Sequence, residues 1–455
     1  MQAITRAIPP RGLDFARRKV YFKENTEIPA SRFEVKNKKG FIMTKFKRMA
    51  AVLAASVLAV VFAGCCCNAS DQEAGRKLPP VKESKTTFAA DALKPFVDSG
   101  ELPGAISVFY NKGLQETACV GWADVDKQIP MAMDRMFMQC SQTKGFCGVT
   151  VAILVEEGKL SLDDPVSKYL PEFKELKIAV KGKDGKTTLV PAKNVLTVRM
   201  VMNHTGGFPF EIPTKQKKGW PGLSLRETAR EAAANPILFE PGTAIRYSNT
   251  GIDIGAAVIE VVTGKPWDVF LKERVLDPLG MTDTTFNPTD EQLARAISMY
   301  DVKGGQKAKF RAFNRWMPLP HNGKDVHPSA GAGLWTTATD QLKFYKMLMN
   351  LGTGENGVRI LKEETVKSLL ATSTRPEGME GYSLGLRAGN GIMTHGGAWG
   401  TNCRVNWQQQ TLRLWVVQQN GKPRPWLKAL DQAATKFFAV KGEDSENDAY
   451  TGRLK

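Results

Sequence analysis

Residues 145–157 are apolar on nearly every side, which limits the folds open to the chain. The apolar side chains fall on all faces of a helix: Phe146, Val149, Val151, Ile153, Leu154 and Val155. A helix that is hydrophobic all round has to be buried, so the other elements must pack around it. Gly158 is expected to end this helix, and Ser141 and Lys144 are expected on its first turn.

Ser141 and Lys144 form a Ser-x-x-Lys pair, and of the 17 serines only Ser141 has a lysine three positions later. Residues three apart lie on the same face of a helix, so the lysine nitrogen can reach the serine hydroxyl. A lysine activates such a hydroxyl by accepting its proton, once burial and nearby positive charge lower the lysine pKa. The Gly-x-Ser-x-Gly elbow of α/β-hydrolases is absent, because Gln139 and Thr143 occupy its glycine positions.

Tyr247-Ser248-Asn249 precedes a second apolar run, residues 251–262, which is predicted to be helical. Tyr247 is a candidate to share the proton with Lys144, as a phenolate base or as a relay. Asn249 is a candidate to hold the lysine and to donate to a substrate carbonyl. The alternative is a loop tyrosine followed by a helix cap at Ser248 or Asn249.

His395-Gly396-Gly397-Ala398 precedes two predicted strands near the C-terminus. Glycines let a backbone approach a substrate closely, and the Ala398 N–H is expected to pair with that of Ser141 as an oxyanion hole. Together the three motifs supply a nucleophile, two proton-transfer groups and an anion-binding backbone. They indicate acyl transfer through a covalent serine intermediate.

The four histidines show no metal-ligand pattern. His204 lies in an Asn-His-Thr-Gly-Gly stretch and is assigned to a structural loop, and His321 and His327 lie in a stretch rich in Pro and Gly. Because the chain has no His-Glu-x-x-His motif and no Cys/His cluster, no metal and no cofactor are expected.

The N-terminus resembles a bacterial lipoprotein signal. A charged stretch from Met43 precedes the apolar run 49–63, and Gly64-Cys65 follows, so Cys65 is the expected lipidation site. The run is short for a membrane span, and a retained membrane helix is the alternative. Translation starts either at Met43 or at the first residue. We expect export and a lipid anchor at the bacterial envelope membrane, facing the periplasm.

Composition divides the chain into four parts: an extension and signal (1–64), a polar tether (65–90), a serine hydrolase domain (91–440) and a polar tail (441–455). Residues 1–64 carry 13 of the 63 Lys and Arg but 4 of the 46 Asp and Glu, so roughly half of the net charge of +17 lies there. The rest has no basic stripe interleaved with aromatic residues, so nucleic acid is not an expected partner.

Strands are predicted at both ends of the domain. Residues 104–113 and 116–123 are joined by Asn-Lys-Gly, residues 403–407 and 412–417 form a second pair, and a helix is predicted over 428–439. This arrangement predicts an α+β fold in which both ends of the domain share one sheet.

The cysteines of the domain do not suggest disulfides. Cys140 and Cys147 would lie about 10 Å apart along one helix, beyond the reach of a disulfide. With Cys119 and Cys403, they are expected to be free, buried, small apolar residues.

Over residues 90–425 the chain resembles the serine β-lactamase and penicillin-recognising hydrolase family, especially class C β-lactamases, D-alanyl-D-alanine carboxypeptidases and β-lactamase-like esterases. Beyond the three motifs, the resemblance rests on Glu156-Glu-Gly-Lys-Leu-Ser-Leu-Asp-Asp-Pro-Val, Met202-Asn-His-Thr-Gly-Gly, Pro241-Gly-Thr, Asp277-Pro-Leu-Gly-Met-Thr-Asp-Thr and Ser329-Ala-Gly-Ala-Gly-Leu-Trp. It implies a mixed antiparallel sheet flanked by helices, a mostly helical subdomain, and a site between them.

The resemblance also implies roles for residues. Ser141 would be the acylated nucleophile, Lys144 and Tyr247 the base pair, and Asn249 a substrate contact, with the strand at His395 beside the site. Class C β-lactamases carry lysine where His395 stands, and a mostly neutral histidine would attract a substrate carboxylate less strongly. Cys140 and Gly145, on either side of the Ser-x-x-Lys pair, are also unusual for the family.

Three hypotheses follow. The protein is a hydrolase of small esters or amides, a D,D-peptidase or β-lactamase with the same machinery, or a lipid-anchored penicillin-binding or sensor protein that turns over nothing. A small molecule or cell-wall peptide and the membrane are the expected partners. The sequence does not indicate the oligomeric state.

Overall fold

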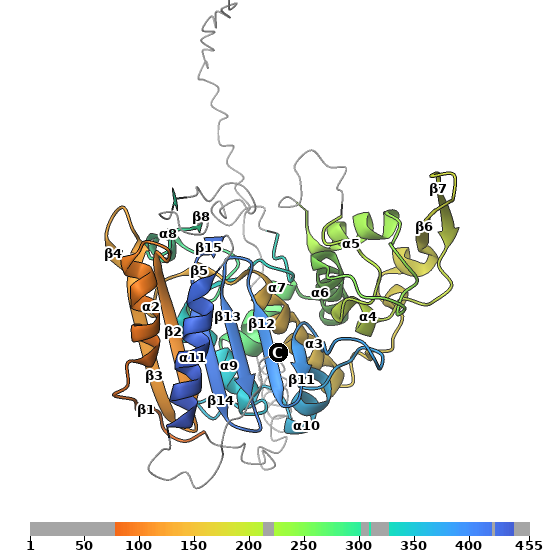
Figure 1. The fold of residues 1–455 in the computed structure, drawn as a ribbon. Coiled ribbons are helices and arrows are strands. Elements are labelled where there is room, and N and C mark those ends of the chain that lie inside the picture. Colours follow the sequence, from red (N-terminus) through yellow and green to blue (C-terminus); the bar gives the residue numbers. More distant parts are fainter. Residues whose placement is uncertain (1–77, 213–222, 302–308, 311–326, 421–423, 441–455) are drawn as a thin grey trace, which may run out of the picture. The chain divides into compact units, whose positions relative to one another are not determined.

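Strands from both ends of the chain form one sheet (Figure 1). The computed structural model describes residues 78–212, 223–301, 309–310, 327–420 and 424–440. The sheet order is β1-β3-β2-β14-β13-β12-β11, with β4 beside β3. Its strands are β1 (Lys82–Glu83), β2 (Gly104–Asn111), β3 (Leu114–Asp124), β4 (Ile129–Pro130), β11 (Arg387–Gly389), β12 (Ile392–Gly396), β13 (Asn402–Asn406) and β14 (Thr411–Val416). The α+β prediction, with both ends of the domain in one sheet, is confirmed.

Both predicted strand pairs form hairpins. Between β2 and β3, Lys112 and Gly113 have φ of 47° and 100°, the left-handed region that a tight Asn-Lys-Gly turn requires. The two hairpins meet where β14 pairs with β2 in antiparallel register, Thr411 opposite Asn111. Because β13 of the C-terminal hairpin also pairs with β12, which carries His395, one continuous sheet connects the His395 strand to the N-terminal hairpin.

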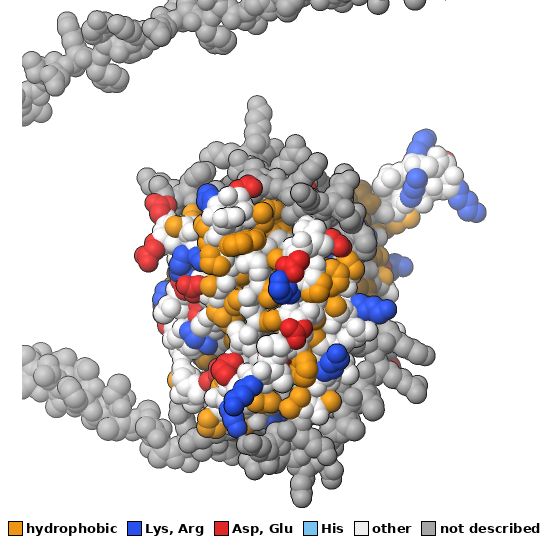
Figure 2. Space-filling model, turned by 60° about the vertical axis from the view of Figure 1, so that its left-hand side comes forward, with side chains coloured by type: hydrophobic (Ala, Val, Ile, Leu, Met, Phe, Trp, Pro, Cys, Tyr) orange, Lys and Arg blue, Asp and Glu red, His pale blue; other side chains and the backbone are white. Residues whose placement is uncertain are grey.

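Helices α2 (Phe88–Asp98) and α11 (Pro425–Ala439) cover one face of the sheet. The buried cluster beneath them includes Ala89, Leu93, Ala105, Phe109, Trp426, Leu430 and Phe437. Side chains alternate along β2, so Ile106, Val108 and Tyr110 belong instead to the larger core on the opposite face. The surface in Figure 2 carries side chains of both charges interspersed with hydrophobic ones.

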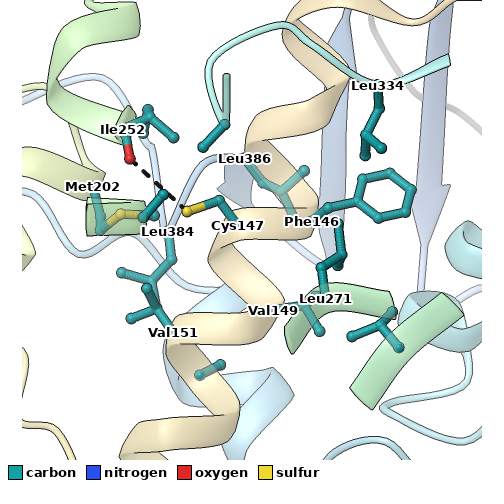
Figure 3. Packing of buried hydrophobic residues seen from close by; sticks show 14 of the residues in the cluster. Phe146, Cys147, Val149, Val151, Met202, Ile252, Leu271, Leu334, Leu384 and Leu386 are labelled. Atoms are coloured by element: carbon teal, nitrogen blue, oxygen red, sulfur yellow. Dashed lines mark hydrogen bonds between the residues drawn. The ribbon is translucent and has the colours of Figure 1, made fainter. Parts of the chain in front are cut away.

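The predicted central helix is α3 (Thr143–Glu156), and every residue from Thr143 to Leu154 is buried. It packs among side chains from several elements (Figure 3): Met202, Ile252, Leu271, Leu334, Leu384 and Leu386. A Cβ on Gly148 would lie 1.8 Å from the Leu384 carbonyl oxygen, and one on Gly145 would lie 2.8 Å from Leu386 Cδ2. The unusual glycine after Lys144 therefore permits close packing at the start of α3.

The elements between β5 and α10 make up the mixed middle of the chain. They are β5 (Phe137–Met138), α4 (Val198–Met202), α5 (Leu225–Ala234), α6 (Asn249–Thr263), α7 (Trp267–Leu271), α8 (Asp290–Ala294), α9 (Ala338–Met349) and α10 (Glu363–Thr365) with strands β6 (Lys177–Lys181), β7 (Thr187–Pro191), β8 (Tyr300–Asp301), β9 (Lys309–Phe310) and β10 (Trp335–Thr336). A final short strand, β15 (Gln419–Asn420), pairs with β8. Among the described residues, no helix has the length and hydropathy of a membrane span.

Two expectations need correction. The folded region is predicted to begin near Phe88, where α2 does start, but β1, which pairs with β3, lies within the stretch predicted to be a tether. A two-residue strand has no periodicity that a sequence could reveal. The four cysteines are free, but Cys119, near the edge of the sheet on β3, is exposed. The signal with Cys65, and the tail 441–455, lie outside the described residues.

Candidate active site

Ser141 lies where a 3₁₀ turn, Cys140–Gln142, leads into α3. Cys140 has a φ of 49°, a left-handed conformation that costs a non-glycine residue roughly 1–2 kcal/mol. The Thr143 hydroxyl stabilises this turn, because it donates to the Cys140 carbonyl (2.7 Å) and accepts from the Leu334 N–H (3.2 Å). The serine is thus held, partly exposed, at the first turn of a buried helix.

Lys144 is fully buried, and its Nζ has three oxygen partners. It donates to Asn249 Oδ1 and the Gly331 carbonyl, both at 2.6 Å, and lies 3.1 Å from Ser141 Oγ. An ammonium would use all three of its protons here. In the neutral amine, two N–H groups would serve Asn249 and Gly331, and the lone pair would face the serine hydroxyl.

Asn249 is the first residue of α6, and the residue before it caps that helix. The Ser248 hydroxyl accepts from the Gly251 N–H (3.0 Å) and donates to the Pro209 carbonyl (2.6 Å). The predicted cap is therefore confirmed at Ser248. The predicted contact between Asn249 and the lysine is also present. The segment therefore caps α6 through Ser248 and contacts Lys144 through Asn249.

The aromatic ring of Tyr247 contacts the Nζ of Lys144. The lysine Nζ lies 4.6 Å from the ring centroid, a cation–π distance. On its other sides the ring contacts His204 (centroids 4.5 Å apart) and Phe210 (6.0 Å). The structure brings Tyr247 to the site as predicted, and the transfer of a proton through its hydroxyl stays a prediction.

Gly331 and Asp253 are at the site, although neither is predicted from the sequence. The buried Asp253 carboxylate, on α6, accepts from the Gly331 N–H (3.0 Å) and the Ser329 hydroxyl (3.1 Å). A Cβ on Gly331 would lie 2.8 Å from Asn249 Cβ, so only glycine fits there. Asp253 thereby fixes the carbonyl that holds Lys144. An aspartate inside an apolar helical run is the sequence signal that could have indicated it.

His395 is buried on β12, and both ring nitrogens have partners within the protein. Nδ1 lies 2.7 Å from the Gly396 carbonyl, so it carries the hydrogen; Nε2, 3.1 Å from the Tyr382 hydroxyl, then accepts from it. Burial, followed by the charge of Lys144, lowers the pKa of His395 to about 3. The histidine is therefore neutral, and its contact with substrate stays a prediction.

His204 supports the Tyr-Ser-Asn segment, in agreement with its assignment to a structural loop. Its Nδ1 accepts from the Ser248 N–H (3.3 Å), and its ring lies against Tyr247 and Tyr382. Burial, with the charge of Lys144, lowers the pKa of His204 well below its usual value.

The glycines after His395 bring the end of β12 to the serine turn. A Cβ on Gly397 would lie 2.5 Å from the Gln139 carbonyl oxygen. The backbone of Ala398 and Trp399 lies beside the Cys140 thiol, whose pKa burial raises to about 11. The role of the Ala398 N–H in an oxyanion hole stays a prediction.

The family of the chain follows from a comparison of its sequence with known families. The sequence model described as Beta-lactamase matches residues 89–435, which is more than half of the chain. The chain belongs to the beta-lactamase family. Within the described ranges, no group of three His, Cys, Asp or Glu side chains is placed to hold a metal ion.

Relatives in the beta-lactamase family include Protein Rv1367c of Mycobacterium tuberculosis. It is 29% identical over 283 residues, covering 61% of this chain and 69% of the relative. Protein flp of Staphylococcus aureus is 27% identical over 228 residues, covering 48% of this chain and 42% of flp.

Solved structures share the fold at low identity. EstCE1, described as a hydrolase with promiscuous acyltransferase activity, has a TM-score of 0.62 at 22% identity, covering 76% of this chain and 97% of its own. Simvastatin synthase (LovD) of Aspergillus terreus has a TM-score of 0.64 at 18% identity, covering 78% of this chain and 99% of its own. A class C β-lactamase has a TM-score of 0.60 at 17% identity, covering 78% of this chain and 96% of its own. The predicted β-lactamase-like architecture is confirmed.

Proposed function

We propose that the protein is a hydrolase of small esters that works through an acyl-enzyme on Ser141. The observation that carries this proposal is the position of Lys144 Nζ. Two neutral oxygens, on Asn249 and Gly331, hold the nitrogen, and its third direction is toward Ser141 Oγ. A nitrogen held in this way can receive the serine proton without moving.

The reaction has two steps that balance in atoms and protons. Ser141 Oγ attacks the acyl carbonyl carbon, and its proton passes to neutral Lys144, directly or through Tyr247. The ester C–O bond then breaks, the leaving oxygen takes that proton and departs as an alcohol, and the acyl group remains on Ser141. Water repeats the sequence and releases the carboxylic acid. Backbone N–H groups at the start of α3 favour the negative charge that develops on the carbonyl oxygen.

The strand side of the site, where His395 lies on β12, favours esters over β-lactams and D-alanyl peptides as substrates. Those two substrate classes carry a carboxylate, and His395 is neutral with both nitrogens bonded inside the protein. The description of EstCE1 as a hydrolase with acyltransferase activity supports testing alcohols as acyl acceptors beside water. A penicillin-binding or sensor protein without turnover is the alternative from a different class.

Intact-protein mass tests the proposal. The full-length protein is exposed briefly to phenyl butanoate and, separately, to a β-lactam, beside Ser141→Ala and the matched control Ser99→Ala at an exposed serine. We expect an acyl adduct and repeated turnover with the ester, lost only in Ser141→Ala. A folded protein that forms no adduct contradicts the proposal, and a stable adduct without turnover favours the sensor alternative.

We also propose that the protein is exported and anchored through a lipid on Cys65, a residue outside the described ranges. The support is the sequence Phe62-Ala63-Gly64-Cys65 after a charged and an apolar stretch. Palmitate labelling and membrane fractionation test it. Cys65→Ala should abolish labelling and release the cleaved protein from the membrane, whereas an unlabelled protein that remains in the membrane would favour a retained helix.

A further inference from the structure

Glu211 is a carboxylate beside the site that the proposed mechanism does not use. It follows Phe210, whose ring stacks with that of Tyr247 at a centroid distance of 6.0 Å. The Asn249 N–H donates to the Phe210 carbonyl (2.9 Å), which holds this segment against the site. The Glu211 carboxyl lies beside the Asn249 side chain, whose amide lowers its pKa. Because Asn249 Oδ1 accepts from Lys144, the NH₂ group is the part of the amide that can donate to Glu211.

These contacts place the carboxylate near the reacting serine. Lys144 Nζ is 3.1 Å from Ser141 Oγ and 2.6 Å from Asn249 Oδ1, and Glu211 lies beside the same amide. Two hydrogen bonds and the Asn249 side chain thus separate the nucleophile from the carboxylate. Glu211 is also exposed, so a short chain attached to a bound acyl carbonyl can reach it.

The charge of Glu211 depends on its surroundings. The pKa of the carboxyl is raised overall, chiefly by partial burial, and Asp253 acts in the same direction. The bond from Asn249 and the charge of Lys144 lower the pKa. Asn249 can donate to the carboxylate only through its NH₂ group, and this bond favours the ionised form.

Arg375 and Arg387 contribute positive charge on the opposite side of the site, since both lower the pKa of His204. Arg375 lies over the Tyr382 ring, and Arg387 pairs with Glu380. His395, at the position where class C β-lactamases carry lysine, donates to Gly396 and accepts from Tyr382. The site therefore has a carboxyl group beside Asn249, and a neutral ring on β12 where a lysine would attract a substrate carboxylate.

We propose that Glu211 makes this site selective for acyl groups that carry a protonated amine two or three carbons from the carbonyl. This inference rests on the proposed ester hydrolysis and names its substrate class. The ammonium donates to the Glu211 carboxylate while the acyl carbonyl lies at Ser141. No bond to Glu211 changes during the reaction, so it determines specificity and takes no part in the chemistry.

Three phenyl esters of matched length test the proposal, those of β-alanine, butanoic acid and succinic acid. They place an ammonium, a methyl group or a carboxylate at the same distance from the carbonyl. A hydrogen bond to a charged group predicts a kcat/KM for the β-alanine ester about tenfold above that for the butanoate, with the succinate lowest. Spontaneous hydrolysis is subtracted for each ester.

Variants of Glu211 provide the second part of the test. Glu211→Gln, which keeps an acceptor for Asn249, should bring the β-alanine to butanoate ratio close to one, and Glu211→Lys should shift the preference to the succinate. Glu240→Gln is the matched control, because this half-buried carboxylate bonds the backbone of Lys193 and Asn194 away from the site. Its ratio should equal that of the parent protein.

The outcomes separate this inference from the proposed function. Butanoate turnover through a Ser141 adduct without any preference for the β-alanine ester overturns the inference and leaves ester hydrolysis standing. A preference that persists in Glu211→Gln also overturns it. If no ester is cleaved and Ser141 forms no adduct, the proposed function fails and the inference fails with it.

Discussion

The two sides of the site are held by different kinds of interaction. On the helix side, Lys144, Asn249 and Asp253 are linked by hydrogen bonds that run from a buried carboxylate to the serine. On the strand side, His395 is neutral and bonds Tyr382, whose ring also lies against that of the neutral His204. The charge of Lys144 contributes to the lowered pKa of both histidines. Once it has accepted the serine proton, the lysine therefore helps to keep these histidines neutral, and positive charge then lies beside the nucleophile.

The largest effect expected in this comparison is that of Lys144→Met on the helix side. It removes the nitrogen that faces Ser141, and loss of a positioned proton-transfer group lowers rates by about 10²–10⁴-fold. The measurement is kcat/KM for phenyl butanoate together with the thermal unfolding midpoint. A folded variant with nearly full activity would show that Lys144 does not activate the serine.

Asp253→Asn should have the next largest effect, because it weakens the support of the Gly331 carbonyl without touching Lys144. Asparagine keeps one acceptor oxygen but loses the negative charge that strengthens both hydrogen bonds, which costs about 1–3 kcal/mol, so we expect kcat/KM to fall by about 10- to 100-fold. Asp340→Asn is the matched control, since this buried carboxylate accepts from the Asp283 N–H and the Thr284 hydroxyl elsewhere. Equal losses of activity in the two variants would mean that Asp253 acts only through stability.

On the strand side, His395 predicts a dependence of stability on pH. Its pKa is about 3 in the folded protein against an ordinary value of about 6.5, so the folded state favours the neutral ring. This contribution is complete above about pH 6.5 and is lost as the pH falls toward about 3. Between about pH 7 and pH 5, the parent should lose about 2 kcal/mol more unfolding free energy than His395→Gln. Urea unfolding at both pH values measures these losses. If the parent and His395→Gln lose the same unfolding free energy, the prediction is wrong.

Tyr382→Phe should lower kcat less than the two changes on the helix side. It leaves His395 Nε2 without its recorded donor, which costs about 1–3 kcal/mol of folding free energy. The helix side is untouched, so kcat should fall much less than in Asp253→Asn. Urea unfolding and butanoate kinetics on the same preparation measure both effects. A loss of kcat as large as that in Asp253→Asn would show that the strand side contributes directly to catalysis.

The parts of the site that could be predicted are those that depend on patterns within a few neighbouring residues. The spacing of Ser141 and Lys144 on a helix follows from helical periodicity, and the Ser248 cap follows from its place before an apolar run. The contacts of Asp253, Glu211 and Tyr382 could not be predicted in this way. Their partners come from segments that only the folded chain brings together, and a polar residue in an apolar run or a loop does not indicate its partner.

The sequence by itself determined the central helix, the two hairpins and the order of the three motifs, because each depends on side-chain periodicity or turn chemistry over a few residues. Tertiary structure decided that β14 lies beside β2, that Gly331 turns its carbonyl to Lys144, and that burial lowers the pKa of His395 to about 3. These features depend on which buried groups meet across long stretches of chain. Burial and hydrogen bonding at those contacts set the electrostatics of the site.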